Sequence, residues 1–222
     1  MLKLDFLSYT YAQYFTDEVV GPEELTDSEK LLIGNFSPKR LRDFCTGRFC
    51  ARQALSTFGY NQPDILVGNS NEPLWPEGIV GSLSHSGQLT GAIVGLSSHF
   101  LSIGIDIETI GKINKDMWDL LYTHGEQRYL KRFTGEVLAY YTTLLFSFKE
   151  SFYKMQYPLT GIFLEFTDIE VNLRGDSFEI TVLKEFTGKN NLSDTVSLYQ
   201  LQEKNQMITL CYLSNNNDIT IT

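Results

Sequence analysis

The stretch IVGSLSHSGQLTGAIVGLSSHFLSIGIDIE, which spans residues 79–108, decides the fold of this 222-residue chain. It holds two short apolar runs rich in β-forming residues, one near 79–84 and one near 90–96, joined through Ser86-Gly87. Two such runs around a glycine turn predict an antiparallel pair of strands. A third run, LSIGIDIE at 101–108, predicts another strand.

Helical signals precede these strands. Thr26-Asp27-Ser28-Glu29 has the form of a capping box and predicts a short helix through Leu32. Ser37 and Pro38 are typical of an N-cap and a first helical position, so a second helix should begin there and end near Gly59. The first ten residues, MLKLDFLSYT, lack a small-residue cleavage site, and we expect a strand rather than a signal peptide.

The rest of the chain repeats this order of helices and strands. Helical patterns occupy about 114–122, about 125–132 and about 135–156, the last of which Pro158 should stop. Two hairpins are expected at 166–173 with 177–184 and at 195–202 with 207–213. The order predicts an α+β fold with two similar halves, each a small antiparallel sheet that carries helices.

Composition excludes several classes of protein. The apolar runs fall far short of the ~20 residues that cross a bilayer, so no transmembrane segment is expected. Three cysteines without metal-ligand spacing indicate reduced thiols of a cytosolic protein rather than disulfides. A net charge of −9 argues against nucleic-acid binding, which needs a basic footprint.

The basic residues nevertheless gather in two groups. The first comprises Lys39, Arg40, Arg42, Arg48 and Arg52, and the second comprises Lys112, Lys115, Arg128, Lys131 and Arg132. Local basic patches on an acidic protein suit a small polyanion or an acidic partner. Solvated helix faces explain Lys39, Lys131 and Arg132 equally well.

Carboxylates and a histidine are the candidates for chemistry. Asp106 and Glu108 alternate on a strand and share one face, where they would repel each other unless a cation lies between them. A pair of solvent-facing acids fits that pattern as well. Glu150 and Lys154 are four apart on a helix, which by itself indicates an ordinary ion pair. Ser84-His85 could donate to phosphate oxygens or form a structural turn.

Five segments in order resemble the Sfp-type 4'-phosphopantetheinyl transferases and look closest to the enterobactin synthase component D branch. They are GRFCARQAL at 47–55, PLWPEG at 73–78, GSLSHS at 81–86, IGIDIE at 103–108 and FKESFYK at 148–154. The resemblance spans about residues 38–170. It implies the 4'-phosphopantetheinyl transferase fold, whose halves are related by pseudo-twofold symmetry. Residues 1–103 would then contact the adenosine and 3'-phosphate of coenzyme A, and 104–222 would hold the metal and dock the carrier protein.

The resemblance also implies an activity. Such enzymes move the 4'-phosphopantetheine arm of coenzyme A to a serine of an apo acyl, peptidyl or aryl carrier protein, release 3',5'-ADP and use Mg²⁺. A cytoplasmic monomer is implied, serving siderophore synthesis such as that of enterobactin, or other nonribosomal peptide or polyketide synthesis. The second basic group, through Lys112, Lys115 or Arg128, would steer an acidic carrier.

Roles follow residue by residue from the same resemblance. Asp106, Glu108 and Glu150 would hold Mg²⁺, which prefers about six oxygens. Coenzyme A would contact five residues, Arg48, Arg52, Ser84, His85 and Lys154, and its 3'-phosphate would be the target of the arginines and His85. Lys154 would contact the attacked phosphate, and Glu150, with Glu126 as a second candidate, would be the general base. We expect Asp106 and Glu150 to lie outside the core.

One position departs from the family pattern. Relatives commonly carry an arginine shortly before the proline of the W-P-x-G segment, whereas Asn71-Glu72 precedes Pro73 here. The other motif positions are intact, but the resemblance does not extend to the phosphate or adenine contact of that arginine. This leaves an alternative, a non-catalytic module of the same fold that binds carrier proteins. An unrelated magnesium phosphohydrolase would explain the acids but not the five segments. A serine hydrolase built on Ser84 and His85 lacks the G-x-S-x-G elbow.

Overall fold

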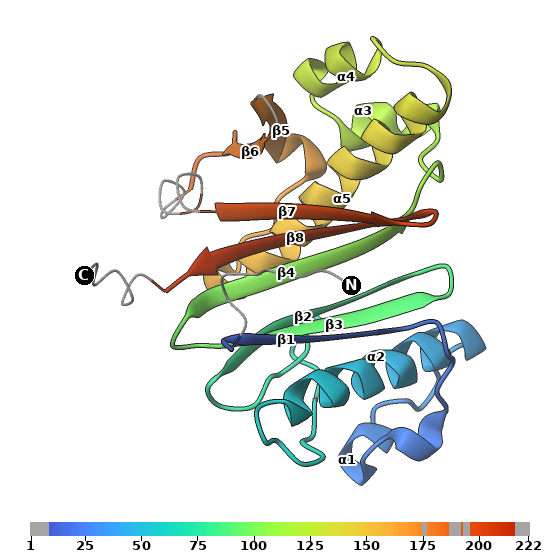
Figure 1. Ribbon diagram of the computed structural model, residues 1–222, viewed down its shortest axis with the longest axis vertical. Coiled ribbons are helices and arrows are strands. Elements are labelled where there is room, and N and C mark those ends of the chain that lie inside the picture. The colour runs from blue at the N-terminus through green and yellow to red at the C-terminus, as the bar shows by residue number, and fades with distance from the viewer. Residues whose placement is uncertain (1–8, 175–176, 187–191, 193–195, 216–222) are drawn as a thin grey trace. The chain divides into compact units, whose positions relative to one another are not determined.

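Figure 1 shows the computed structural model of the chain, which describes residues 9–174, 177–186, 192 and 196–215. The described chain divides after Ile103 into two compact units, and Asn215 joins the first of them. The strand expected in the first ten residues falls almost wholly outside the described residues. Within the described ranges, none of the helices combines the length and hydrophobicity that a membrane span needs.

A three-stranded antiparallel sheet forms the first unit, in the order β1-β3-β2. Its strands are β1 (Tyr11–Thr16), β2 (Ile79–Ser86) and β3 (Leu89–Leu96). The antiparallel pair of strands predicted around Ser86-Gly87 is confirmed as β2 and β3. The turn between them contains Gly87, whose φ of 63° is a left-handed conformation that glycine adopts without steric strain. Strand β1 was not predicted, because YAQYFT finds its strand partner only in β3, far along the sequence.

Helix α2 (Pro38–Ser56) packs on β1 and β3 (Figure 1). The Ser37 hydroxyl accepts the Arg40 N–H at 3.3 Å and Pro38 takes the first turn, so the predicted start is confirmed. The face toward the sheet is made of small and apolar side chains, which let the helix lie close to the strands. Its buried members are Cys50, Ala51, Ala54 and Leu55.

Two short elements precede α2. They are the 3₁₀ turn η1 (Pro22–Glu24) and helix α1 (Asp27–Lys30). Helix α1 opens with the predicted capping box: the Thr26 hydroxyl accepts the Glu29 N–H, and the Glu29 carboxylate accepts the Thr26 N–H at 3.1 Å. Glu29 is nevertheless fully buried, which a capping role alone does not require.

The second unit contains a three-stranded sheet, a hairpin and the longest helix. The sheet has the order β4-β8-β7, with β4 (Phe100–Thr109), β8 (Gln206–Ser214) and β7 (Val196–Glu203). The hairpin joins β5 (Ile169–Arg174) to β6 (Ser177–Val182), and the second predicted hairpin is β7 with β8. Helix α5 (Gly135–Thr160) packs along β8, and its core residues include Leu144, Phe148 and Phe152.

Short elements connect β4 to α5. They are η2 (Lys115–Met117), α3 (Trp118–Leu121) and α4 (His124–Leu130). The single helix predicted over 114–122 is wrong, because this segment is divided into the 3₁₀ turn η2 and the short helix α3. Tyr122 is extended, and the Thr123 hydroxyl caps the next helix, α4. Similarly, Phe166–Asp168 forms a 3₁₀ turn, η3, before β5 begins, since the Asp168 carboxylate accepts the Glu165 N–H at 2.8 Å.

Helix α5 continues through Pro158 rather than stopping before it. Proline removes one backbone donor and disfavours a helical residue before it. Only Leu159 and Thr160 follow it in the helix, so little of the hydrogen-bond ladder is lost. The helix ends at Gly161, whose φ of 64° is left-handed and whose N–H donates to the Tyr157 carbonyl at 2.8 Å.

Gly104 is the point at which β4 and α5 come closest. A Cβ placed on Gly104 would lie 1.9 Å from the Ser151 carbonyl oxygen and 2.6 Å from the Met155 nitrogen, both of them backbone atoms. Only glycine allows this approach. Because Asp106 follows two residues later on β4, the same contact fixes the strand against the helix that carries Glu150 and Lys154.

Gly104→Ala should therefore lower the free energy of unfolding by at least about 1–3 kcal/mol, since backbone has to move to admit one methyl group. Urea unfolding of the purified protein measures this. Gly34→Ala is the matched control, because a Cβ at Gly34 meets nothing within 4 Å. Equal stability of the two variants would contradict the close packing of β4 on α5.

Candidate active site

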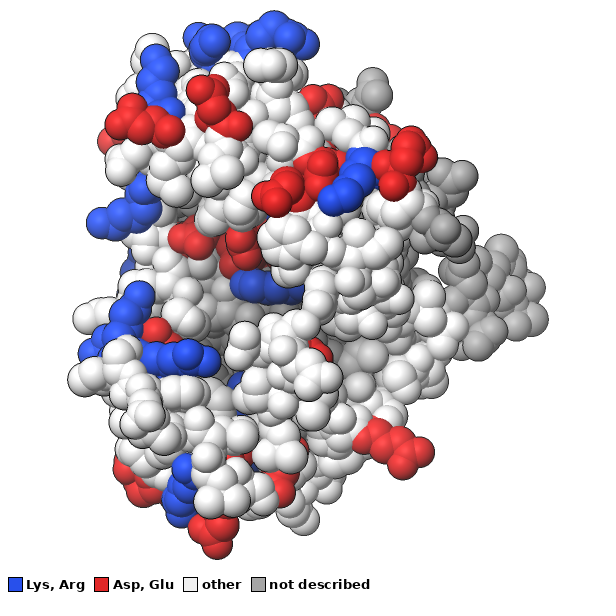
Figure 2. Space-filling view, turned by 180° about the vertical axis from the view of Figure 1, so that it is seen from behind, with Lys and Arg blue, Asp and Glu red and all other residues white. Residues whose placement is uncertain are grey.

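A pocket of about 380 Å³ lies in the first unit, beside the first turns of α2 and the end of β2. Its polar and charged lining comprises Ser37, Lys39, Arg40, Asp43, Arg48, Ser84, His85 and Thr90. Figure 2 shows Lys and Arg side chains gathered over the first turns of α2, on the left of the view. Cations and hydroxyl groups around one cavity suit a small polyanion.

Arg48 lies at the inner wall of this pocket and is only 5% exposed. Its Nε donates to the Ile65 carbonyl at 2.6 Å, its Nη2 donates to the Leu66 carbonyl at 3.4 Å, and the guanidinium lies over the Phe44 ring. Burial, helped by the charge of Arg52, lowers the pKa of Arg48 to about 10. Among the described residues no carboxylate forms an ion pair with Arg48, so its positive charge is available to a bound anion.

Ser84 and His85 lie at the end of β2 and both line the pocket, as does Arg48. The structure thus brings three of the five predicted coenzyme A residues together, whereas Arg52 and Lys154 do not line this pocket. Ser84 is buried, whereas the His85 side chain is 48% exposed, with its Nδ1 3.7 Å from a carboxylate oxygen of Asp43.

Ser37 and Asp43 could not be recognised in the sequence as pocket residues, Arg40 was recognised only as part of a basic group suited to a polyanion, and Lys39 fitted that group and a solvated helix face equally well. A signal was present in the helix period. Arg40, Phe44 and Arg48 recur every four residues, so they share one face of α2, and all three line the pocket. What the period could not reveal was which face of α2 looks into a cavity.

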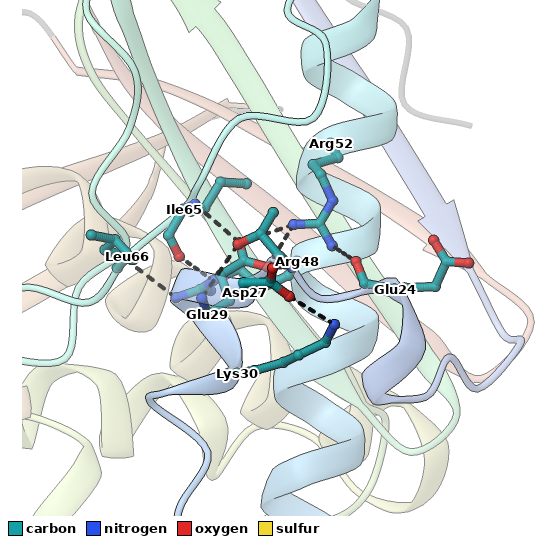
Figure 3. A network of polar contacts seen from close by, with 9 residues as sticks. Glu24, Asp27, Glu29, Lys30, Arg48, Arg52, Ile65 and Leu66 are labelled. Carbon is teal, nitrogen blue, oxygen red and sulfur yellow. Dashed lines mark hydrogen bonds and ion pairs between the residues drawn. The ribbon is translucent and has the colours of Figure 1, made fainter.

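Arg52 lies outside this pocket, in the network drawn in Figure 3. Its Nη1 donates to both carboxylate oxygens of Glu29, at 2.8 and 2.9 Å, and its Nη2 donates to the Glu24 carbonyl. Glu29 in turn accepts the Ile65 N–H at 3.0 Å. Arg52 and Glu29 are 5% and 0% exposed, so Arg52 balances a buried carboxylate and ties α2 to α1 and to the segment that holds Arg48.

Asn71 has a positive φ of 67°, and its N–H donates to the Gly68 carbonyl at 3.1 Å. Asparagine is one of the few residues that tolerate this left-handed conformation in a turn. The residue that stands near the family's arginine position therefore has a local backbone reason for its identity. Its presence gives no support to loss of catalysis.

A second group of candidate residues, Asp106, Glu150 and Lys154, lies on β4 and α5. Oδ1 of Asp106 accepts from Lys154 Nζ at 2.7 Å, and its Oδ2 accepts from the Ser147 hydroxyl at 2.9 Å. The expectation that Asp106 lies outside the core is wrong, because the residue is only 3% exposed. Ser147 comes from α5, one turn before Ser151, and was not singled out in the sequence.

Glu150 and Lys154 lie one turn apart on α5, and both are partly buried. Burial raises the pKa of Glu150, the charge of Lys154 lowers it, and the charge of Asp106 raises it. The two carboxylates are therefore within electrostatic reach of each other. Glu108, two residues after Asp106 on β4, is partly buried and takes the same side of the strand as Asp106.

These residues fit a magnesium ion in their chemistry. All three are carboxylates, the ligand that Mg²⁺ prefers, and the raised pKa of Glu150 marks a site that gains from more positive charge. In the described part of the chain, however, no three acidic, histidine or cysteine side chains are already gathered as metal ligands. Lys154 holds Asp106 in this conformation.

Glu126, the second candidate for general base, is fully engaged in structural contacts. One carboxylate oxygen accepts the Val171 N–H at 2.8 Å, and the other accepts the Thr123 N–H at 2.8 Å and Lys149 Nζ at 2.6 Å. Lys149 also donates to the Leu121 and Phe166 carbonyls. This buried pair pins α4 and the start of β5 to α5. Glu150, which is only partly buried, is therefore the remaining candidate for the general base.

The comparisons with known proteins agree with this picture. Residues 28–95 match the model of the 4'-phosphopantetheinyl transferase N-terminal domain, and residues 102–211 match that of the 4'-phosphopantetheinyl transferase superfamily. The chain is 34% identical to the 4'-phosphopantetheinyl transferase Svp of Streptomyces mobaraensis over 75% of this chain and 69% of that protein. It is 35% identical to PptT of Mycobacterium tuberculosis over 78% of this chain and 74% of that protein.

The chain therefore belongs to the 4'-phosphopantetheinyl transferase superfamily, and it is an enzyme that transfers 4'-phosphopantetheine to carrier proteins. The expected closeness to enterobactin synthase component D needs correction. That protein of Escherichia coli is 34% identical over only 52% of this chain and 54% of its own length, a smaller share than the Svp and PptT matches cover. The holo-[acyl-carrier-protein] synthase of Thermotoga maritima superposes with a TM-score of 0.42 at 19% identity, over 51% of this chain and 63% of that one.

Proposed function

We propose that this enzyme takes the phosphopantetheine arm from coenzyme A, attaches it to a serine of an apo carrier protein and releases 3',5'-ADP. The observation that carries the proposal is the cluster of Asp106, Glu150 and Lys154, in which a buried acid, a partly buried acid and an ammonium group lie close together. Such a cluster suits the transfer of a phosphoryl group, where catalysis is mostly positioning and electrostatic stabilisation.

Asp106, Glu108 and Glu150 are the residues that would hold Mg²⁺. The ion supplies positive charge to the pyrophosphate of coenzyme A when it is bound. Lys154 would bind an oxygen of the attacked phosphate and offset the negative charge that develops there. The carrier's serine is the nucleophile, so this chain needs only a base, and the raised pKa of Glu150 suits a carboxylate that accepts that proton.

The pocket of the first unit would bind the 3'-phosphate of coenzyme A. Arg48 offers a buried charge with no carboxylate partner among the described residues, while Ser84 and His85 can donate hydrogen bonds. We add Lys39 and Arg40 to this set, because both line the same cavity. We remove Arg52 from this set of 3'-phosphate contacts, because its guanidinium already donates to the Glu29 carboxylate and the Glu24 carbonyl.

Replacing His85 with alanine tests the 3'-phosphate assignment. Because the side chain is about half exposed, folding should be unaffected, and KM for coenzyme A should rise about tenfold through loss of one charge-assisted hydrogen bond. The matched substrate is dephospho-coenzyme A, which lacks only the 3'-phosphate. With dephospho-coenzyme A, wild type and His85→Ala should have the same KM. If the variant raised KM for dephospho-coenzyme A as much as for coenzyme A, His85 would not bind the 3'-phosphate.

The carrier and pathway belong to the same proposal. Lys112, Lys115 and Arg128 are exposed on the second unit and would attract an acidic carrier despite the overall charge of −9. We place the enzyme in the cytoplasm as a monomer, serving siderophore or other nonribosomal peptide or polyketide synthesis. Comparing kcat/KM for apo-carriers from siderophore, peptide and fatty-acid synthesis identifies the pathway, and preference for the fatty-acid carrier would contradict this placement.

A further inference from the structure

The ion pair between Lys154 and Asp106 occupies the place where the proposed function needs a metal. Nζ of Lys154 lies 2.7 Å from Oδ1 of Asp106, and the two side chains are 28% and 4% exposed. Glu150 lies one helical turn earlier on the same face of α5, so the ammonium also acts on its carboxylate through space. One cation therefore serves two of the three proposed metal ligands.

The cluster places two carboxylates beside one ammonium group. Lys154 contributes one positive charge, whereas Asp106 and Glu150 contribute two negative charges when both are ionised. A divalent ion in place of the ammonium would balance both carboxylates, so it has an electrostatic advantage over a single ammonium.

Lys154 and a metal ion compete for the same carboxylate. Oδ2 of Asp106 already accepts the Ser147 hydroxyl at 2.9 Å, and Oδ1 accepts Lys154. Two cations on one carboxylate oxygen repel each other strongly at low exposure. Lysine has a flexible four-carbon stem, and the partly exposed Lys154 can swing away, whereas Asp106 is fixed by β4 and Ser147.

We propose that Lys154 is a built-in counter-ion, which holds Asp106 in the metal-free enzyme and is displaced when Mg²⁺ binds, so that its ammonium becomes available to a phosphate of the substrate. This inference rests on the proposed function, which assigns Asp106 as a metal ligand. It adds an order of events: the metal binds first, and Lys154 is then free for its catalytic contact. Coupling of this kind is reciprocal, so removing Lys154 must strengthen metal binding.

Lys154→Met tests the proposal by calorimetric titration of the purified protein with Mg²⁺ in the absence of coenzyme A. Methionine keeps an apolar stem but lacks the competing charge, so Mg²⁺ should bind about tenfold more tightly than to wild type. The metal-free variant should also unfold at a lower temperature than wild type. Lys184→Met is the matched control, because Lys184 pairs with Asp168 at 3.1 Å elsewhere in the same unit, and its affinity should equal that of wild type.

The outcomes separate this inference from the proposed function. An unchanged or weaker Mg²⁺ affinity in Lys154→Met overturns the counter-ion role, while loss of Mg²⁺ binding in Asp106→Asn upholds the metal assignment on its own. If Asp106→Asn binds Mg²⁺ as wild type does, the metal assignment fails and this inference falls with it.

Wild-type protein provides a readout that does not depend on the folding of any variant. Acetylation of individual lysines is followed by peptide mass spectrometry with and without Mg²⁺. The rate at Lys154 should rise several-fold with Mg²⁺, because Nζ leaves Asp106 and becomes more exposed, and the rate at Lys184 should stay constant. An equal rate at Lys154 under both conditions overturns the proposal.

Discussion

Asp106→Asn is expected to lower kcat/KM for transfer by about 10³-fold, because it removes a charge from the centre of the proposed metal site. Asparagine is the informative replacement, since Asp106 is buried and its side chain bonds to Ser147 and Lys154. Its oxygen can still accept the Ser147 hydroxyl, so the thermal unfolding midpoint should fall far less than in an alanine variant. Steady-state kinetics and a thermal melt on the same preparation separate the two effects.

Asp168→Asn is the control for this substitution. Asp168 also forms an ion pair with a lysine, Lys184, but it lies outside the proposed metal site and is more exposed than Asp106. Asp168→Asn should therefore leave the transfer rate unchanged. A transfer rate in Asp106→Asn within a few-fold of wild type would contradict the role assigned to the β4 carboxylates.

Arg52→Met is expected to lower the free energy of unfolding by about 3–5 kcal/mol, the usual cost of stranding one partner of a buried ion pair. The stranded partner is Glu29, which is 0% exposed and would keep only its backbone donors. Urea unfolding gives the value. The sequence had suggested instead that Arg52 contacts coenzyme A. In that case Arg52→Met would raise KM for coenzyme A and leave the free energy of unfolding nearly unchanged, which would contradict the structural role.

Adding Glu29→Gln to Arg52→Met provides the control. The double variant no longer buries an unpaired charge, so it should recover a large part of the stability that the single variant loses. The N–H groups of Thr26 and Ile65 would compete for the single remaining oxygen acceptor, which keeps the recovery incomplete. A double variant no more stable than Arg52→Met would show that packing, not charge, is what Arg52 contributes.

Elements with local signals were predicted well from the sequence. The capping box at Thr26, the start of α2 at Ser37, and the β2–β3 and β7–β8 hairpins all depend on residues close together in the chain. Strand β1 has no such signal, because its partner β3 lies far along the sequence. The helix end predicted before Pro158 was wrong, because the cost of a proline depends on how much helix follows it, and only two residues of α5 follow Pro158.

The candidate site divides in the same manner. Spacing placed Arg48 and Arg52 on one face of a helix, but it could not show that Glu29, from a capping box more than twenty residues earlier in the chain, takes Arg52 away from the pocket. It likewise placed Glu150 beside Lys154, whereas the structure pairs Lys154 with Asp106 on another element. Partners of buried charges are set by tertiary packing, and a single sequence does not encode them locally.

The most direct measurement is the intact mass of an apo carrier protein incubated with this enzyme, coenzyme A and Mg²⁺. The carrier should gain the mass of one 4'-phosphopantetheine group, with one equivalent of 3',5'-ADP released, and the gain should vanish when Mg²⁺ is chelated or Asp106→Asn replaces the wild type. A carrier of unchanged mass, or one modified equally well without divalent metal, would contradict the proposed reaction and its metal site.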